Sequence, residues 1–314
     1  MFKKRILSIL LLCSTLTYSQ TQSNLDLDIY YGKNILKEYI RPIADGFSAG
    51  LNNGWYNTGK PHKFGGFDIT IAGNIVLIPE SYKMFLISEI GGNSFSGGET
   101  PTIVGEKEPS EITYDSSSVI MPSGLNIPVF PVPIVQAGIG LIKGTEINIR
   151  YLPKINVGKV DQINLYGFGV KHDLLQWIPG GKILPISLSV QGGYTKFNST
   201  VVIENVIGDR NNELAFDVEA MTANIILSKK ILMFTPYASI GYNSSKSSFK
   251  IDGDYAVGSL ELNAEELTNI EYESNTELRA NLGFRFNIAI LALQANYTIS
   301  KYPVATLGAG ISFR

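Results

Sequence analysis

The stretch from Ile270 to Phe286 alternates between mostly apolar and mostly polar side chains along its whole length. Side chains of a β-strand point in turn to its two faces, so this stretch predicts one long strand with an apolar and an ionic face. Strands of soluble proteins average about 5–6 residues, whereas a tilted strand needs about 9–11 to cross a bilayer. Such alternation is typical of an outer-membrane barrel wall. The even-numbered side chains are expected to face lipid and the odd-numbered ones the lumen.

The N-terminus has the features of a secretory signal peptide. A basic cluster, Lys3-Lys4-Arg5, precedes an apolar run from Ile6 to Leu12, and small and polar residues lead to a cleavage site before Gln20. The run is too short for a spanning helix, so residues 1–19 are predicted to be removed on export. Cys13, the sole cysteine, lies in this signal, and the leucine before it argues against lipid attachment.

The composition agrees with an exported β protein. Hydrophobic residues make up 44% of the chain and aromatic residues 11%, with 31 glycines and 16 tyrosines, a profile typical of barrels. Removing Lys3-Lys4-Arg5 leaves 23 of the 26 Lys and Arg against 28 Asp and Glu, a formal charge of −5. Nucleic-acid binding needs concentrated positive charge, so no nucleic-acid partner is expected.

Residues 20–62 carry a helical pattern that the rest of the chain lacks. The apolar positions at helical spacing are Ile35, Leu36, Tyr39, Ile40, Ile43 and Phe47. They predict one or two short amphipathic helices, which pack inside a barrel as a plug or sit at its periplasmic mouth. An ordinary helix that covers a sheet edge is the alternative reading.

From Phe64 onward the period becomes two. Strands are expected near 67–77, 135–142, 145–152, 160–171, 186–203, 213–228, 231–250, 270–286, 288–300 and 304–313, with others between Tyr82 and Met121. Single-chain bacterial barrels usually have an even strand number. The prediction is therefore an all-β, antiparallel transmembrane β-barrel of about twelve strands, with ten to fourteen allowed, and a short N-terminal helical segment. The predicted regions are a signal peptide (1–19), a helical plug or periplasmic segment (20–62) and the barrel (63–314).

Two aromatic residues carry signals for membrane placement. The final strand alternates in polarity and has Phe313 as its last aromatic, which resembles the signal read by the outer-membrane insertion machinery. Trp177 has apolar neighbours in a segment between strands and is predicted to anchor the barrel at the lipid headgroups. We therefore expect the outer membrane of a Gram-negative bacterium, with its lipid and the insertion machinery as partners. A soluble exported β domain is the alternative.

Charged side chains on the predicted inner faces are the main candidates for a functional site. These lumen-facing candidates are Glu146, Arg150, Glu271, Glu273, Glu277, Arg279 and Arg285. Carboxylates and guanidiniums inside a low-dielectric shell pair readily. They either line a polar conduit or binding cavity, or they fill the interior of a small barrel and pass nothing.

The sequence offers little for catalysis or metal binding. The only two histidines, His62 and His172, have no cysteine or second histidine at ligand spacing. Ser187 and Ser189 are near a predicted strand start, but no motif pairs them with a base. The chain is therefore expected to be no enzyme and to hold no metal or cofactor.

Several segments resemble an uncharacterised bacterial outer-membrane barrel family. They are Gly50 to Thr58, Lys60 to Lys63, Lys143 to Pro153 and Gly169 to Gly180. The chain is more distantly similar to the long-chain fatty-acid transporter class, in which a helical hatch precedes the barrel. That similarity implies passage of hydrophobic solutes, although the Asn-Pro-Ala hatch motif is missing and fewer strands are expected.

Two functions fit these observations. The first is a channel or transporter for small or hydrophobic solutes, with a hydrophobic ligand as a partner. The second is a structural or accessory protein of an export or surface-assembly system without transport activity, since the long polar segments 91–133 and 252–269 offer contact surfaces.

Overall fold

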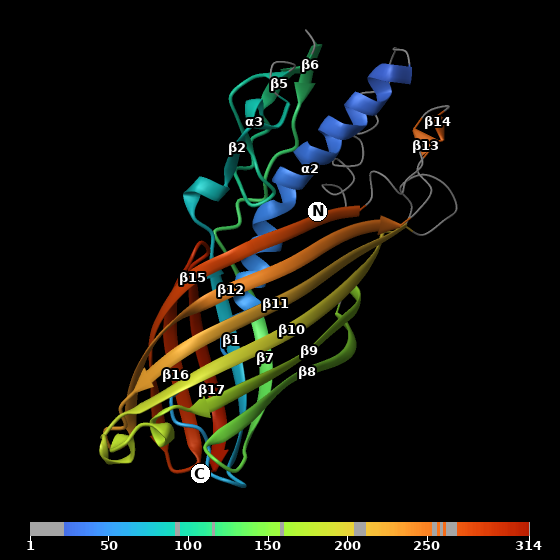
Figure 1. The fold of residues 1–314 in the computed structure, drawn as a ribbon. Coiled ribbons are helices and arrows are strands. Elements are labelled where there is room, and N and C mark those ends of the chain that lie inside the picture. The colour runs from blue at the N-terminus through green and yellow to red at the C-terminus, as the bar shows by residue number, and fades with distance from the viewer. Residues whose placement is uncertain are drawn as a thin grey trace.

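A computed structural model describes residues 22–91, 95–114, 117–157, 160–203, 212–252, 256–257, 260–261 and 269–313. The predicted signal peptide with Cys13 lies outside the described residues. The barrel strands are β1 (Phe67–Leu77), β7 (Val129–Gly140), β8 (Thr145–Val157), β9 (Val160–Asp173), β10 (Ser187–Ile203), β11 (Asn212–Ser228), β12 (Phe234–Asp252), β15 (Asn269–Ile288), β16 (Leu291–Ile299) and β17 (Val304–Phe313). They form a closed antiparallel barrel in which β1 pairs with both β17 and β7 (Figure 1).

The barrel has ten strands, so the preferred number of twelve was wrong while the all-β antiparallel barrel is confirmed. The segments expected as further barrel strands are too short to cross a membrane, and the strands in them pair with one another rather than with the barrel. They are β2 (Met84–Leu86), β3 (Phe95–Ser96), β4 (Glu99–Pro101), β5 (Glu111–Tyr114) and β6 (Ser117–Ile120), which form two small sheets beyond one end of the barrel. These five strands and the short helices between them are called the module from here on.

The remaining elements are short. They are α3 (Ser88–Gly91), the 3₁₀ helices η1 (Glu80–Tyr82), η3 (Leu175–Trp177) and η4 (Gly181–Ile183), and the strands β13 (Ala256–Val257) and β14 (Leu260–Glu261). Among the described residues, no helix is long and apolar enough to cross a membrane.

The two ends of the barrel differ in their connections. At one end, called the turn end, tight connections such as Lys143-Gly144 join the strands, and both of these residues have positive φ, 56° and 61°. Positive φ at successive residues is common in the tight turns of hairpins. The other end, called the loop end, carries the module and the short strands β13 and β14 (Figure 1).

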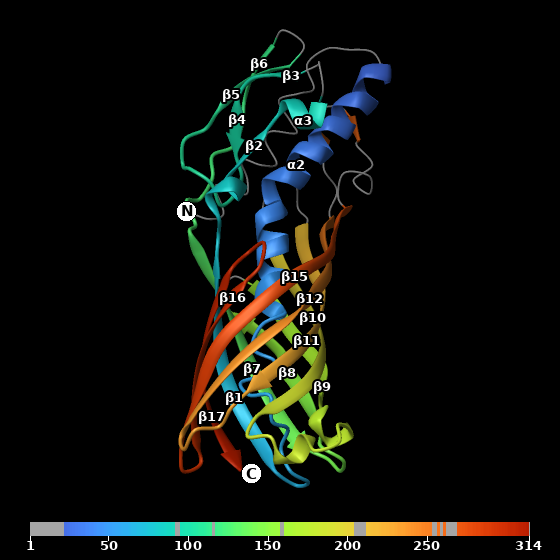
Figure 2. The same cartoon turned by 60° about the vertical axis from the view of Figure 1, so that its left-hand side comes forward.

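Helix α2 (Gln22–Leu51) enters the barrel from the loop end, beside the module (Figure 2). It ends at Asn52-Asn53-Gly54, where Gly54 has φ +78°, the left-handed conformation that commonly terminates helices. Residues 55–66 then continue through the lumen to the turn end, where β1 begins. The N-terminal segment is thus threaded through the barrel from the loop end to the turn end.

The outer face of the barrel carries a band of exposed apolar side chains. Exposed aliphatic side chains there include Ile69, Ile71, Ile139, Ile149, Ile225, Leu227, Ile240, Leu278, Leu282, Leu293 and Leu307. Exposed aromatic residues lie toward both borders. Those near the turn end are Phe67, Trp177, Phe234, Phe284 and Phe313, and those nearer the loop end are Tyr151, Tyr166, Tyr242 and Tyr297. An apolar band between aromatic girdles is the surface that a bilayer requires.

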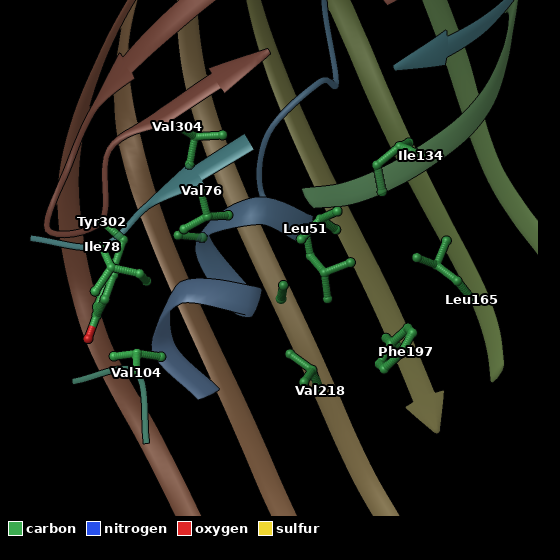
Figure 3. Close-up of a cluster of buried hydrophobic side chains, with 13 residues drawn as sticks. Leu51, Val76, Ile78, Val104, Ile134, Leu165, Phe197, Val218, Tyr302 and Val304 are labelled. Atoms are coloured by element: carbon green, nitrogen blue, oxygen red, sulfur yellow. The ribbon is translucent and has the colours of Figure 1, made fainter. Parts of the chain in front are cut away.

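Toward the loop end, the outer face of the strands β10, β11, β12 and β15 becomes polar and their inner face becomes apolar. The outer face carries a row of charges in cross-strand register, Lys196, Glu219, Lys246 and Glu273, which pair as Lys196–Glu219 at 2.8 Å and Lys246–Glu273 at 2.6 Å. The inner face becomes apolar and packs against α2, as the cluster around Leu51, Phe197 and Val218 shows (Figure 3). These strands are 17–20 residues long, well beyond the roughly 9–11 that cross a bilayer.

Candidate functional site: the plugged lumen

Residues 44–66, called the plug below, fill the lumen and contact its wall at three levels. An apolar level lies nearest the loop end, an arginine level surrounds the end of α2, and a latch closes the turn end. Each level has its own chemistry, and the contacts are described in that order.

At the apolar level, the last turns of α2 pack against aliphatic and aromatic side chains of the wall. Phe47 lies 4.5 Å from Phe197 and 5.6 Å from Phe216, measured between ring centroids. Gly50 has no room for a side chain, because a β-carbon there would come within 2.5 Å of Val132. The close approach of helix and wall therefore depends on a small residue at this position.

Arg150 on β8 binds the end of the helix at the arginine level. Its Nη1 donates to the carbonyl of Leu51 and its Nη2 to the carbonyl of Asn53, both at 2.6 Å. The last carbonyls of a helix have no partner within it and form the negative end of its dipole. A cationic donor therefore satisfies them well, and hydrogen bonds of this kind contribute about 1.5–3 kcal/mol each.

Arg279, on the distant strand β15, binds the same turn at the end of α2. Its Nη1 donates to the carbonyl of Asn52 at 2.7 Å, and its Nη2 donates to the side-chain oxygen of Asn53 at 2.6 Å. Thr298 donates to that same oxygen, and Asn74 donates to the Asn53 carbonyl at 3.2 Å. Asn53 is thus the residue on which four wall side chains converge, if Arg150 is included.

Trp55 follows directly and is clamped between two parts of the wall. The Arg150 guanidinium lies 3.6 Å from the centroid of its ring. On the other side the ring lies against Gly169 and Gly193, where a β-carbon would come within 2.7 Å and 2.5 Å of it. The next contacts toward the turn end are polar, with Tyr56 bonded to Ser239 and Arg285 donating to the Asn57 side chain at 2.6 Å.

The latch centres on Glu146. One carboxylate oxygen accepts from the backbone N–H of His62 at 2.8 Å and contacts its Nδ1 at 2.8 Å, while the other pairs with Lys171 at 2.8 Å. The His62 Nε2 lies 3.2 Å from the Ser312 hydroxyl. Gly65 and Gly140 also bond through their backbones. The plug is therefore pinned to β8, β9 and β17 where it leaves the barrel.

The order Ser312–His62–Glu146 matches the connectivity of a hydrolytic triad, but the surroundings do not match that use. Ser312, His62 and Glu146 are all buried, and Glu146 is shared with the Lys171 ammonium. A nucleophile must reach a substrate beside oxyanion donors. The geometry fits a latch that holds the plug.

The rim at the loop end adds an ion pair between helix and barrel. Lys301, in the connection between β16 and β17, donates to Asp45 at 2.8 Å. Burial of the ammonium lowers its pKa, but the hydrogen bond and the charge of Asp45 outweigh this effect and raise the pKa of Lys301 above its ordinary value. Tyr272 donates to the Lys37 carbonyl at 2.7 Å, so the rim also holds the helix farther out.

Four of the candidates named from the sequence, Glu146, Arg150, Arg279 and Arg285, are buried on the inner wall in contact with the plug. Glu277 is half-buried on the same face of β15 as Arg279. Arg150 and Arg279 donate to backbone carbonyls rather than to carboxylates. For these two arginines, pairing with the plug takes the place of the expected pairing with carboxylates.

Glu271 and Glu273 lie on the outer face, so their expected lumen position was wrong. The register of β12 and β15 shifts between Asn243 and Ser245, where β15 has one extra residue. One extra residue reverses which side chains face inward. Ile270 and Tyr272 are accordingly buried against α2, although the alternation of the sequence assigns them to the lipid.

The two predicted membrane signals lie on the outer surface near the turn end. Trp177 is 66% exposed, and its Nε1 donates to His172 at 2.9 Å. Phe313 is exposed and stacks on Phe67 with 4.9 Å between the ring centroids. The described residues contain no group of three or more His, Cys, Asp or Glu side chains placed to hold a metal ion.

Sequence reasoning missed the plug residues that make most of these contacts. Asn53, Trp55 and His62 each hold several wall groups. The sequence did contain a cue for them: the apolar stripe of the helix is followed by the run Asn52-Asn53-Gly54-Trp55. Polar side chains directly after an amphipathic helix that enters a barrel are placed to contact a polar inner wall. The wall residue Asn74, which bonds Gly50 and Asn53, was equally unmarked.

Comparison with known proteins gives a family and no activity. DUF6588, a family of unknown function, matches residues 1–313, which confirms the predicted membership of an uncharacterised family. No curated protein matches the chain.

Solved structures with a similar fold are outer-membrane barrels. The translocator domain of the autotransporter NalP from Neisseria meningitidis is 10% identical with a TM-score of 0.33, covering 91% of this chain and 99% of that chain. The outer-membrane protease OmpT from Escherichia coli is 8% identical with a TM-score of 0.33, covering 79% and 97%. The toluene transporter TbuX from Ralstonia pickettii is 7% identical with a TM-score of 0.26, covering 82% and 90%. These TM-scores lie below 0.5, so the likeness carries no argument about activity.

Proposed function

The chain belongs to the DUF6588 family of unknown function, and we propose that it is a pore of the Gram-negative outer membrane held shut by its own N-terminal segment. In this proposal the plug moves to admit small solutes. The resting molecule is closed, since the plug contacts the wall at all three levels.

The outer surface supports the membrane location. Exposed aliphatic residues lie between two girdles of exposed aromatic residues, which suits a hydrocarbon core with a headgroup layer on each side. Outer-membrane barrels have short periplasmic turns and long extracellular loops, so the turn end is assigned to the periplasm and the loop end to the outside. Membrane lipid then surrounds the apolar band between the two aromatic girdles, and Trp177 anchors the barrel at the periplasmic border. The strand that ends at Phe313 is the segment read by the insertion machinery.

The observation that carries the pore is the polarity of the inner wall. Below the apolar level, most buried residues of the wall are hydrogen-bonding ones, and Ile226, which packs near Trp55, is one of the few apolar ones. The hydrogen-bonding ones include Ser189, Gln191, Thr222, Asn224, Ser239, Asn243, Asn281, Gln294, Thr298 and Thr306. Filling a barrel permanently needs no such wall, because apolar packing is often as stabilising as buried polar networks. A polar wall stays compatible with water when the plug leaves.

Several wall atoms point the same way. Ser189 Oγ, Gln191 Nε2, Asn281 Oδ1 and Gln294 Oε1 are buried and have no hydrogen-bond partner among the described residues. Buried polar atoms without protein partners are normally satisfied by ordered water. The wall thus supports a hydrated lumen around the plug.

An engineered disulfide between plug and wall tests the proposal. A β-carbon at Gly50 lies 3.0 Å from the Val132 β-carbon, close to the roughly 3.5–4.5 Å of natural disulfides. The predicted mature chain has no cysteine of its own, so Gly50→Cys with Val132→Cys gives one defined bridge. Swelling of liposomes in a small sugar such as arabinose measures the pore.

The oxidised double variant is expected to swell no faster than empty liposomes, and reduction should restore the rate of the unmodified protein. The Val132→Cys single variant serves as the control that cannot form the bridge, because Gly50→Cys alone would meet the Val132 methyl group at 2.5 Å. Equal rates before and after reduction would show that the plug is not the gate. No swelling with any variant would show that the protein is not a pore.

A second candidate function is an anchor for a surface module. It is favoured by the way α2 continues beyond the barrel and packs against the module. The Tyr39 hydroxyl donates to the Ser123 carbonyl, and the Tyr39 backbone carbonyl accepts from the Ile103 N–H. In this case the plug stays seated and the module presents the contact surface of an export or assembly system. Crosslinking in intact cells through cysteines on the module should then recover a defined partner, while liposome swelling stays at the baseline.

A further inference from the structure

Arg150 and Arg279 are neutralised in an unusual way. Both are buried, with 0% and 4% of their surface exposed. None of the ion pairs within the described residues includes either of them. Their shortest backbone acceptors are the carbonyls at the end of α2, the negative end of the helix dipole, and their other acceptors are uncharged side chains such as Gln136 and Asn243. The helix end occupies the place of an anion.

The arginine pair also retains binding capacity that the plug leaves unused. The Nε of Arg279 is buried and has no hydrogen-bond partner among the described residues. A guanidinium binds carboxylate or phosphate oxygens through two parallel N–H donors. The seated plug supplies separate oxygens instead: three Nη atoms bind backbone carbonyls, and the Nη2 of Arg279 binds the side-chain oxygen of Asn53. An anion with two oxygens is a better match to this fork than the carbonyls it would replace.

The wall directly beyond the arginines, toward the loop end, is apolar. On β10 the inner position after Thr195, which contacts Arg150, is Phe197. On β11 the inner positions after Thr222, which contacts Arg279, are Ala220 and Val218. The aromatic rings farther out form a continuous row, since Phe216 stacks on Phe249 at 4.2 Å, Phe249 contacts Tyr272, and Phe197 contacts Phe216.

The arginine pair and the apolar wall beyond it suit a ligand that is apolar along its length and negative at its inner end. The last turns of α2 have these two properties. We propose that the Arg150–Arg279 pair and the aromatic row form a binding site for an organic anion with an apolar body. The anion enters from the loop end and competes with the end of α2 for the arginines. The site rests on the proposed function, because the plug must move for the anion to bind.

A ligand shifts an equilibrium only by its difference in affinity between the two states. The seated plug covers both guanidiniums, so the anion binds the open state alone. Binding therefore raises the share of open molecules above the share that is open without the anion.

Tryptophan fluorescence of the full chain tests the site. The chain has two tryptophans, so Trp177→Phe leaves Trp55 alone, stacked on Arg150 in the seated plug. The probes are octanoate, octylammonium as the control for charge, and acetate as the control for the apolar body. Octanoate should shift the Trp55 emission to the red with saturation, while the two controls at equal concentration should leave it unchanged.

Substitutions locate the effect. Arg279→Gln should raise the octanoate midpoint more than tenfold, and Arg279→Lys should raise it less, because a lysine keeps the charge without the fork. Lys246→Gln, which removes a cation from the outer face, should leave the midpoint unchanged. Heat-modifiable migration on a gel checks that each variant forms a closed barrel, and Arg150→Lys gives a second test if Arg279→Gln does not fold.

The outcomes separate the two proposals. If octanoate and octylammonium act alike, the response is that of a detergent and the anion site is wrong. If the disulfide shows that the plug gates swelling but octanoate leaves Trp55 unmoved, the pore stands and the anion site falls. If the disulfide has no effect on swelling, the pore itself fails, whatever octanoate does.

Discussion

Replacing Gly193 with alanine tests how tightly the plug is seated. A β-carbon at this position would lie 2.5 Å from the Trp55 ring, closer than any ordinary contact. The ring has no free direction in which to retreat, because the Arg150 guanidinium lies 3.6 Å from its centroid on the other side. Either β10 bends or the plug shifts along the lumen.

The neighbouring glycine supplies the matched control. Gly192 points to the outer face, where a β-carbon would meet nothing within 4 Å. Both substitutions replace glycine by alanine in the same strand, so the gain in chain stiffness, about 0.5–1 kcal/mol, is shared. Overpacking costs about 1–3 kcal/mol, so only Gly193→Ala should lose that amount.

That loss falls on the seated state of the plug, because withdrawal of Trp55 relieves the clash. A difference of 1–3 kcal/mol shifts a two-state equilibrium by about 5- to 150-fold. In the Trp177→Phe background, Gly193→Ala should move the Trp55 emission to the red and raise the swelling rate of liposomes, whereas Gly192→Ala should change neither.

A compensating substitution completes the test. Trp55→Leu removes the ring that meets the new methyl group, so its combination with Gly193→Ala should cost less than the sum of the two single effects. Contacting residues commonly couple by about 0.5–3 kcal/mol in such cycles. If the costs simply add, or if the two glycine variants behave alike, the described seating of Trp55 against the wall is incorrect.

Three further predictions concern the plug contacts. Asn53→Ala removes the side-chain acceptor of Arg279 and should weaken plug seating by about 1.5–3 kcal/mol, seen as faster liposome swelling. Glu146→Gln leaves its buried lysine partner without a counter-ion and should destabilise the barrel by about 3–5 kcal/mol in thermal unfolding, whereas Glu271→Gln on the outer face should stay within about 0.5 kcal/mol. Because the pKa of Lys301 is raised by Asp45, this ion pair should stabilise the helix from neutral pH up to about 10.5 and lose its effect as the pH rises through the raised value. Limited proteolysis of α2 against pH should show that loss, and Lys301→Gln should remove its pH dependence.

The sequence predicts the wall of this barrel better than its contents. Alternation locates β8 to β12 and β15 to β17 to within a few residues, because each strand has one face in an apolar medium. The glycine of the turn at Lys143-Gly144 tolerates positive φ, whereas Lys143, with φ 56°, carries no such signal. The strand number was overestimated, since the module strands share the strand composition but are only 2–4 residues long.

The bulge in β15 shows a limit of alternation. Ser274, Asn275 and Thr276 are all polar, so neither face is marked where the extra residue enters. The apparent pattern runs on unbroken through the point at which inside and outside exchange. An apolar side chain next to helix α2 and one next to lipid have the same composition, and only the strand register tells them apart.

The partners of the arginines were hidden for a different reason. Arg150 and Arg279 bind backbone carbonyls, which every residue possesses and no sequence pattern reveals. The direction of threading was hidden as well, because the apolar stripe of α2 reads the same whether the helix enters from the loop end or the turn end.

The direction of threading places a condition on how the barrel is assembled. Residues 52–66 join α2 at the loop end to β1 at the turn end, and β1 and β17 form the seam between the two ends of the barrel sequence. A helix held inside a completed ring cannot reach the far side unless it is pulled through a lumen already lined by side chains. We therefore expect the ring to close around the N-terminal segment, so that the pairing of β1 with β17 is also the step that encloses the plug.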